Sequence, residues 1–232
     1  KADEISEGDT NYLGACTKGR TAKSNWRQQP FSNKKAKGRA FSLKASYVNS
    51  MIERMIGRGD AEPIENKVVK DPIELKDRTF EEIVLGRFEP FIGRTTDDIA
   101  QELGVTARKQ TKNFNDLVTK AILKVKDRVI EFEKADIIVK SIVLETSGRL
   151  KESVSFPAFD YIELMKETDW ETSKIREMFE RRFFFVVYQK RSDDARLLTK
   201  VMFWSLPIKD LLEVKKVWQT TRKAIREGRY AD

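Results

Sequence analysis

The sequence predicts an α/β (α+β) domain in which a mixed central β-sheet is flanked by helices and preceded by a basic arm. Between about residues 42 and 125, most segments have apolar residues at helical spacing or helix-capping signals. The second half instead carries β-branched and aromatic runs between helices, a pattern typical of a sheet with helical layers. The length of 232 residues suits one large domain with an arm. We place the arm and first helix at residues 1–60 and the domain at residues 61–232.

The composition excludes several kinds of chemistry. Histidine is absent, so a Ser-His-Asp triad, a Cys-His pair and a histidine-based zinc site are excluded within this chain. Carboxylate, lysine and divalent-metal chemistry remains, which is how many nucleases activate water. The single cysteine excludes an internal disulfide framework and favours a reducing cytoplasm. No apolar run is long enough to predict a membrane span.

Positive charge is concentrated in the arm. The chain has a net charge of +8, yet the stretch from Thr10 to Ile52 contains nine lysines and arginines and no Asp or Glu. Aromatic residues are interleaved among these cations, which is unusual for a disordered tail. The pattern predicts an arm ordered either against the domain or on a nucleic acid backbone, where lysine and arginine contact phosphates electrostatically. A solvated linker whose aromatic residues pack on the domain is the alternative.

Five elements are expected in the first half. Residues 42–56 have helical spacing, residues 64–75 look extended, and Thr79 caps a helix that runs to about Phe91. Thr96 is expected to cap a short helix that Gly104 ends, and a longer helix follows over residues 111–125.

The second half contains the predicted sheet. Residues 135–144 read as a strand, and residues 153–162 as its antiparallel partner. Two further strands and two helices follow, with Pro207 at the first position of the last helix; they are a helix at 171–181, strands at 183–188 and 198–205, and a helix at 207–227. The aromatic residues of these elements are expected in the core.

Asp71, Glu74 and Lys76 form a candidate catalytic motif. Many restriction-type nucleases hold Mg²⁺ with an Asp and a Glu-X-Lys on neighbouring strands. Here both carboxylates lie on one short segment, and Pro72 disfavours a central strand. A surface segment ahead of the helix at Thr79 is the favoured interpretation, and a domain that itself cleaves DNA through these residues is the alternative.

Residues 99–120 form a second candidate motif. Ile99 to Thr106 resembles the first helix and turn of a helix-turn-helix, and Arg108, Lys109 and Lys112 would begin a recognition helix. An ordinary helix pair joined by a glycine turn is the favoured interpretation, and a helix-turn-helix DNA-binding regulator is the alternative function.

Several stretches resemble a known family of nucleases. Residues 170–176 (Trp-Glu-Thr-Ser-Lys-Ile-Arg) and 203–207 are similar to the MutH mismatch-repair endonuclease, and residues 138–152 look like the strands that bear its catalytic Glu-Leu-Lys. The arm closely resembles the junction and second half of two-domain, MutH-like type II restriction endonucleases that recognise GATC. The stretches that carry this second resemblance are residues 4–8, 12–13, 16–19, 29–32, 35–44, 70–72 and 132–134.

The resemblance implies a MutH-like, restriction-endonuclease-like fold and a degenerate active site. In that family the first half cuts DNA with Mg²⁺, whereas the second half is an inactive DNA-binding effector domain. Ile138 stands where the catalytic Glu is expected, and Lys140 where the catalytic Lys is expected. Glu131 matches the first catalytic Asp, and Lys120 replaces a further carboxylate of the metal site. No catalytic residue, metal site or cofactor is therefore expected in this chain.

The resemblance implies three partners, which are double-stranded DNA with GATC sites, the catalytic N-terminal half of the same protein and a second copy on DNA. It also implies a prokaryotic cytoplasm as the location, with no membrane partner. The arm and the former active site supply the expected DNA-binding residues, which are Lys18, Arg20, Lys35, Lys37, Arg39, Lys112, Lys120, Lys140, Arg149, Lys174 and Arg176.

Overall fold

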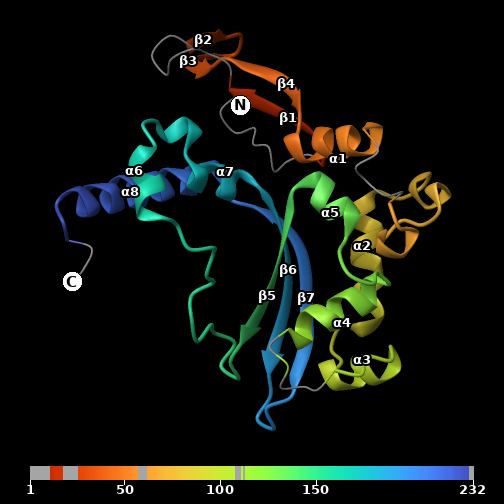
Figure 1. The fold of residues 1–232 in the computed structure, drawn as a ribbon. Helices are drawn as coiled ribbons and strands as arrows, with labels where there is room; N and C mark the ends of the chain where they lie inside the picture. The colour runs from red at the N-terminus through yellow and green to blue at the C-terminus, as the bar shows by residue number, and fades with distance from the viewer. Residues whose placement is uncertain (1–10, 18–25, 57–61, 108–110, 112, 230–232) are drawn as a thin grey trace. The chain divides into compact units, whose positions relative to one another are not determined.

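The computed structural model describes residues 11–17, 26–56, 62–107, 111 and 113–229, which form two compact units (Figure 1). One unit, here called the arm unit, comprises residues 1–44, 155–182 and 205–232. The other, the sheet unit, comprises residues 45–154 and 183–204. This grouping differs from a division at residue 60, because the first helix belongs with the sheet unit and the arm groups with the last helix.

The sheet unit is built around a three-stranded sheet. Its strands are β5 (Ile137–Leu144), β6 (Arg182–Lys190) and β7 (Arg196–Ser205), in the order β5-β6-β7. A tight turn joins β6 to β7, with Arg191 N–H donating to the Ala195 carbonyl at 2.8 Å. Lys190 and Glu145 form an ion pair of 3.0 Å, so the carboxyl ends of β5 and β6 lie together and these two strands run parallel. The expected mixed sheet is therefore confirmed.

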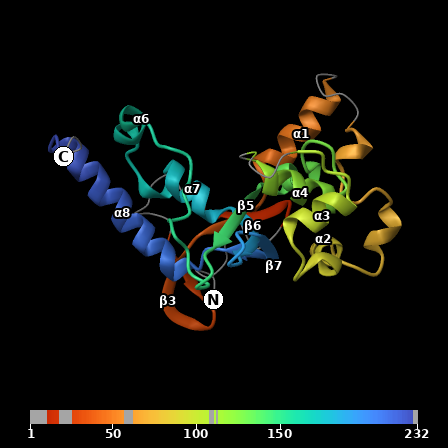
Figure 2. The same ribbon diagram turned by 90° about the horizontal axis from the view of Figure 1, so that it is seen from below.

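Alternation along β6 gives the sheet its main packing face. Phe184, Val186 and Tyr188 are fully buried and point to one face, because successive side chains of a strand alternate. Helices α2 (Phe80–Phe88), α4 (Phe114–Leu123) and α5 (Ile130–Ala135) cover this face. Figure 2 shows α2 and α4 gathered with α3 on one side of the strands.

The rings from these elements pack closely. Phe184 lies 5.5 Å from Phe88 of α2 and 5.3 Å from Phe132 of α5, measured between ring centroids. Rings at this distance in tilted arrangements add to the free energy gained from burial. The prediction that the β6 aromatic residues form core is confirmed.

Local capping signals place the helices of the first half. Helix α1 spans Ala45–Met55, within the expected range. Thr79 caps α2 through a capping box, in which its hydroxyl accepts from Glu82 N–H and the Glu82 carboxylate accepts from Thr79 N–H. The expected continuation to Phe91 is a 3-10 turn, η5 (Glu89–Phe91).

The next cap is shifted by one residue from the prediction. Thr95, not Thr96, caps helix α3 (Thr96–Glu102), because the Thr95 hydroxyl accepts from Asp98 N–H at 3.1 Å. Thr96 is buried at the first helical position instead. Gly104 ends the helix with a φ of 70°, as expected.

Two expected extended segments are wrong. Residues 64–75 form two 3-10 turns, η3 (Ile64–Asn66) and η4 (Pro72–Leu75), and the Asp71 side chain caps the second. Residues 153–162 are not a strand, because residues 153–160 have no regular secondary structure. Leu144 and Leu150 form an isolated bridge, and β5 pairs with β6. Asp160 instead caps helix α6 (Tyr161–Lys166).

The arm unit combines two strand pairs with helices. Strand β1 (Leu13–Thr17) pairs antiparallel with β4 (Arg39–Leu43), and β2 (Trp26–Gln29) pairs with β3 (Ser32–Lys37). The described part of the arm is thus ordered, as the interleaved aromatic residues predicted, although the strands were not foreseen.

Helices complete the arm unit around a small core. A 3-10 turn η6 (Trp170–Thr172), helix α7 (Lys174–Glu180) and helix α8 (Ile208–Arg226) follow the sequence expectation, with Pro207 as the cap of α8 instead of its first residue. The core is formed by four buried side chains, Leu164, Trp170, Leu211 and Trp218.

Among the described helices, none has the length and apolar character needed to cross a membrane.

Replacing Phe184 by Ala tests the importance of the β6 face. We expect the free energy of unfolding to fall by about 3–5 kcal/mol, because removing a large ring from the centre of the core leaves a cavity. Urea denaturation measures the change. Met55→Ala, on the same unit but with a side chain 79% exposed, is the control and should change the value by less than about 0.5 kcal/mol. Similar losses in both variants would contradict this assignment of the core.

Candidate nucleic-acid interface

The four positions of the expected degenerate active site all lie in the sheet unit. Lys120 is in the last turn of α4, Glu131 is in the first turn of α5, and Ile138 and Lys140 are on β5. Ile138 and Lys140 are two residues apart on one strand, so they share a face of the sheet. Both side chains are half-buried.

The Glu131 carboxylate holds a neighbouring segment of backbone. Its two oxygens accept from the backbone N–H groups of Val68 and Val69, at 3.2 and 3.0 Å. Arg87 of α2 donates to the Val68 carbonyl at 3.0 Å, so the same segment is bound on both its donor and acceptor sides. Val68 is fully buried. The carboxylate therefore satisfies buried backbone donors that would otherwise lack partners.

Lys120 forms an ion pair within its own helix. Its Nζ lies 2.9 Å from Asp116 Oδ2, one turn earlier on α4, and its side chain is 26% exposed. An ion pair at this spacing is weak when solvent reaches it. The lysine remains accessible to a stronger anionic ligand.

These residues do not fit a magnesium site. Mg²⁺ requires oxygen ligands in octahedral geometry, which neither Ile138 nor a lysine can provide. Glu131 is the only carboxylate among the four positions, and both its oxygens already accept hydrogen bonds. Within the part of the chain that the structure describes, no group of three or more Cys, Asp or Glu residues could hold a metal.

The candidate motif at Asp71, Glu74 and Lys76 lies on the 3-10 turn η4 and not on a strand. Asp71 Oδ1 accepts from Ile73 N–H at 2.9 Å, and Glu74 pairs with Arg87 at 3.4 Å. The carboxylates thus cap a turn and balance a cation. The interpretation as a surface segment ahead of Thr79 is confirmed.

The candidate helix-turn-helix corresponds to α3 and α4. In the connection between them, the described residues 103–107 are not helical, whereas the motif uses a turn of three or four residues. Arg108, Lys109 and Lys112 lie outside the described residues. The described geometry does not match a helix-turn-helix.

The expected DNA-binding residues of the arm differ in their surroundings. Lys18 and Arg20 lie outside the described residues. Lys35 is exposed on β3, and Arg39 begins β4. Lys37 forms an ion pair of 2.5 Å with Glu171. Arg149, in the sheet unit, is exposed in the turn that follows β5.

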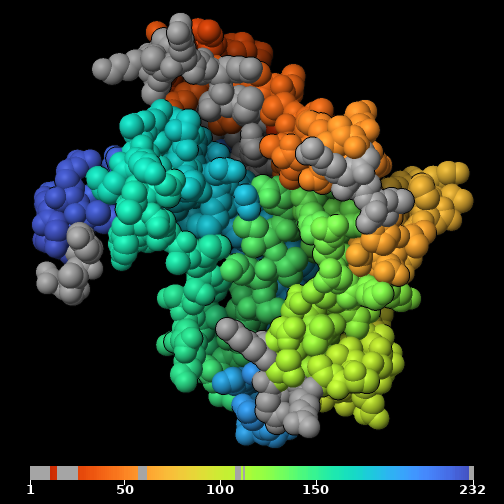
Figure 3. All heavy atoms as spheres, in the orientation of Figure 1, coloured from red at the N-terminus to blue at the C-terminus, as the bar shows by residue number. Residues whose placement is uncertain are grey.

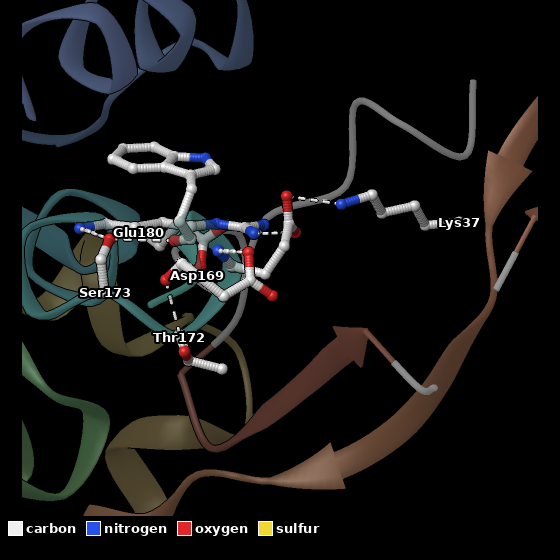
Figure 4. Close-up of polar contacts among 8 residues, drawn as sticks. Lys37, Asp169, Thr172, Ser173 and Glu180 are labelled. Atoms are coloured by element: carbon white, nitrogen blue, oxygen red, sulfur yellow. Dashed lines mark hydrogen bonds and ion pairs between the residues drawn. The ribbon is translucent and has the colours of Figure 1, made fainter. Parts of the chain in front are cut away.

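Arg176 forms the centre of an ion cluster in the arm unit. It is 8% exposed, and its guanidinium binds both Glu171 and Glu180, with Nη2 lying 2.8 Å from Glu180 Oε1. Figure 4 shows Lys37 reaching this cluster from its strand. Burial lowers the pKa of Arg176, but the charges of Glu180 and Glu171 outweigh it and raise the pKa. Both carboxylates stabilise the cation within the fold.

Sequence analysis predicted the cation but missed its two acceptors. Glu180 follows Arg176 by four residues on α7, which is a recognisable helical pairing. Glu171 precedes the helix on η6, so only the fold brings it to Arg176. Lys174, on the same helix, is exposed and lies 3.5 Å from Glu163.

Comparison with known proteins relates the chain to a restriction enzyme. No protein-family model matches it. The chain is 38% identical over 245 aligned residues to the type II restriction enzyme Sau3AI of Staphylococcus aureus. The alignment covers 98% of this chain and 49% of that enzyme, so the chain spans about half the length of its relative.

Replacing Glu131 by Gln tests its role in the fold. An amide would present N–H atoms to backbone N–H groups, so we expect the free energy of unfolding to fall by about 1–3 kcal/mol. Urea denaturation is the measurement. Glu133→Gln is the matched control, because Glu133 is 52% exposed and its pair with Arg128 is exposed too. Equal stability of the two variants would contradict the anchoring role.

Replacing Glu171 by Gln tests the ion cluster through its pH dependence. Burial alone raises the pKa of Glu171, but the hydrogen bond from Lys37 and the charge of Arg176 bring it below its ordinary value of 4.5. Because the folded-state pKa is lower than the unfolded one, the ionised carboxylate stabilises the fold above the unfolded value. This contribution is lost as the pH falls through the lowered pKa.

We therefore expect Glu171→Gln to be less stable than the original chain by about 1.5–3 kcal/mol at pH 7, the range for hydrogen bonds to charged groups. The difference should shrink as the pH falls below 4.5. Urea denaturation between pH 7 and pH 3 measures it. Glu177→Gln on the same helix, where the side chain is 71% exposed, should show little difference throughout. A difference for Glu171→Gln that does not vary with pH would contradict the assignment.

Proposed function

We propose that this chain is a DNA-binding effector domain of a type II restriction endonuclease that recognises GATC. In this proposal the chain does not cut DNA, and it binds a second DNA site while a separate catalytic half cleaves with Mg²⁺. The observation that carries the proposal is the chemistry of the four positions at Lys120, Glu131, Ile138 and Lys140, in a chain related to half of a restriction enzyme.

The exchange of charge at these positions supports DNA binding without cleavage. A hard divalent cation needs carboxylates, whereas Lys120 and Lys140 would repel it and attract a phosphate. Glu131, the remaining carboxylate, holds backbone donors. The site thus has the groups to bind a DNA backbone and lacks the groups to activate water.

Not every expected cation has the same role in the proposal. Lys35, Arg39, Lys120, Lys140, Arg149 and Lys174 are the proposed phosphate contacts, and Lys18, Arg20 and Lys112 remain proposed from the sequence alone. Lys37 and Arg176 are bound to carboxylates of the arm unit. We propose that these two position the unit and do not contact phosphate.

The parent protein would contain a catalytic N-terminal half, and two copies would meet on DNA. Binding of a second GATC site would favour the active arrangement of the other half by a differential affinity for two states. The parent would act in a prokaryotic cytoplasm, where restriction enzymes meet incoming DNA.

Fluorescence anisotropy of the 232-residue chain on duplexes with GATC or a scrambled site tests the proposal. We expect roughly tenfold tighter binding to GATC, close to the cost of one mismatched base pair, at both low and moderate salt. Incubation of a GATC plasmid with the chain and Mg²⁺ should give no cleavage. Lys120→Gln combined with Lys140→Gln should weaken binding to both duplexes, since phosphate contacts carry no sequence information.

The matched control replaces Lys70 and Lys76, two exposed lysines of the same unit, by Gln and should bind as the original chain does. Absence of binding to either duplex would refute the DNA-binding function. Cleavage of the plasmid would refute the inactive role and favour the enzyme alternative. Equal binding to both duplexes would refute recognition of GATC by this chain.

A further inference from the structure

Helix α8 of the arm unit carries a face of basic residues that the proposed contacts do not include. Five side chains spaced by three, four or eleven residues share this face, because such spacings return to one side of a helix. They are Lys215, Gln219, Arg222, Lys223 and Arg226. No Asp or Glu occurs between Val214 and Arg226. Figure 3 shows part of α8, in blue, at the molecular surface.

A cavity of about 360 Å³ opens along this face. The cavity is lined by these five side chains and by four further residues, Thr168, Asp169, Trp170 and Trp218. Among the described residues that line the cavity, Asp169 is the single carboxylate, and one of its oxygens already accepts from Glu171 N–H at 3.1 Å. Four cations and one carboxylate therefore give the cavity a net positive charge.

Most of these cations have no carboxylate partner in the described part of the chain. Among the described residues, none provides an ion pair for Lys215, Arg222 or Arg226, and Lys223 has only a long contact of 3.9 Å with Glu227. Lys216, on the neighbouring side of the same helix, pairs with Glu213 at 2.7 Å. Helix α8 therefore neutralises Lys216 but leaves a cluster of like charges on its basic face. Such a cluster is unfavourable without an anionic ligand.

One cation is held in place by an aromatic ring. The Arg222 guanidinium lies 4.6 Å from the centroid of Trp218, which is buried and donates from Nε1 to Glu167 at 2.6 Å. A guanidinium stacked on a ring keeps donors at its edge for a phosphate. Because Trp218 belongs to the core, this arginine is positioned before any ligand arrives.

We propose that this face of α8 binds the phosphodiester backbone of double-stranded DNA, as a second contact besides the sheet-unit lysines. The inference rests on the proposed function and extends it. From Lys215 to Arg226 the face extends roughly 16 Å along the helix axis, at about 1.5 Å per residue. Duplex DNA presents a charge about every 3.4 Å along each strand, so several phosphates match this length.

The test compares two double variants that each remove two lysines from α8. Lys215→Gln with Lys223→Gln changes the basic face, and Lys209→Gln with Lys216→Gln changes exposed lysines outside the cavity. Anisotropy with GATC and scrambled duplexes over a salt series gives the slope of log K against log salt. We expect the first pair to weaken binding equally on both duplexes and to reduce the slope by about 2, one for each lost phosphate contact.

The control pair should keep the original slope. Lys215→Arg with Lys223→Arg should restore it, since the charge and not the lysine is required. Circular dichroism of each variant checks that the fold is intact. If the original chain binds DNA and the first pair leaves affinity and slope unchanged, the inference is overturned while the DNA-binding function stands. If the original chain does not bind DNA, the proposed function itself fails.

Discussion

Burial of one face of strand β6 is the constraint on which the sheet unit depends. Phe184, Val186 and Tyr188 point into three helices that come from distant parts of the sequence. Tyr188 requires a polar partner there, and its hydroxyl lies 3.3 Å from Thr119 Oγ1 and 3.4 Å from the Asn115 carbonyl. Burial raises the pKa of Tyr188 to about 12, because a buried site disfavours the charged phenolate. The position of α4, and with it Lys120, follows from this contact.

The packing of α2 and α5 on the same face of the sheet positions Arg87 and Glu131. Phe88 and Phe132 fix these helices against Phe184, and from them Arg87 and Glu131 reach the segment at Val68. A carboxylate at the start of α5 is thus employed in holding the chain together. The two Glu131 oxygens could either bind a metal ion or accept backbone hydrogen bonds, and in this structure they accept hydrogen bonds from Val68 and Val69. This use of Glu131 supports the proposal that the site binds DNA and does not cut it.

Features set by neighbours in sequence could be predicted, and features set by distant contacts could not. The capping box at Thr79 and Glu82 spans four residues, so its pattern was sufficient. Thr95 and Thr96 both suit a cap, and the choice depends on Thr96 being buried by the fold. Residues 153–162 had a strand-like composition, but β5 found its partner in β6, about forty residues later. Strand β3 pairs with β2 through its backbone, which its composition of Lys and Asn does not reveal.

The same distinction decides which cations are available for a ligand. Arg176 and Arg222 are both arginines of the arm unit, and a count of charges treats them alike. Arg176 is buried between two carboxylates, whereas Arg222 stacks on Trp218 in a cavity with three further cations. A buried cation with its partners satisfied has little to gain from DNA, because binding would first break those contacts. A stacked cation among like charges is stabilised by a bound polyanion, because the polyanion reduces the repulsion between those charges. Charge along the sequence therefore suggests a polyanionic ligand, but the neighbours of each cation determine which cations are free to bind one.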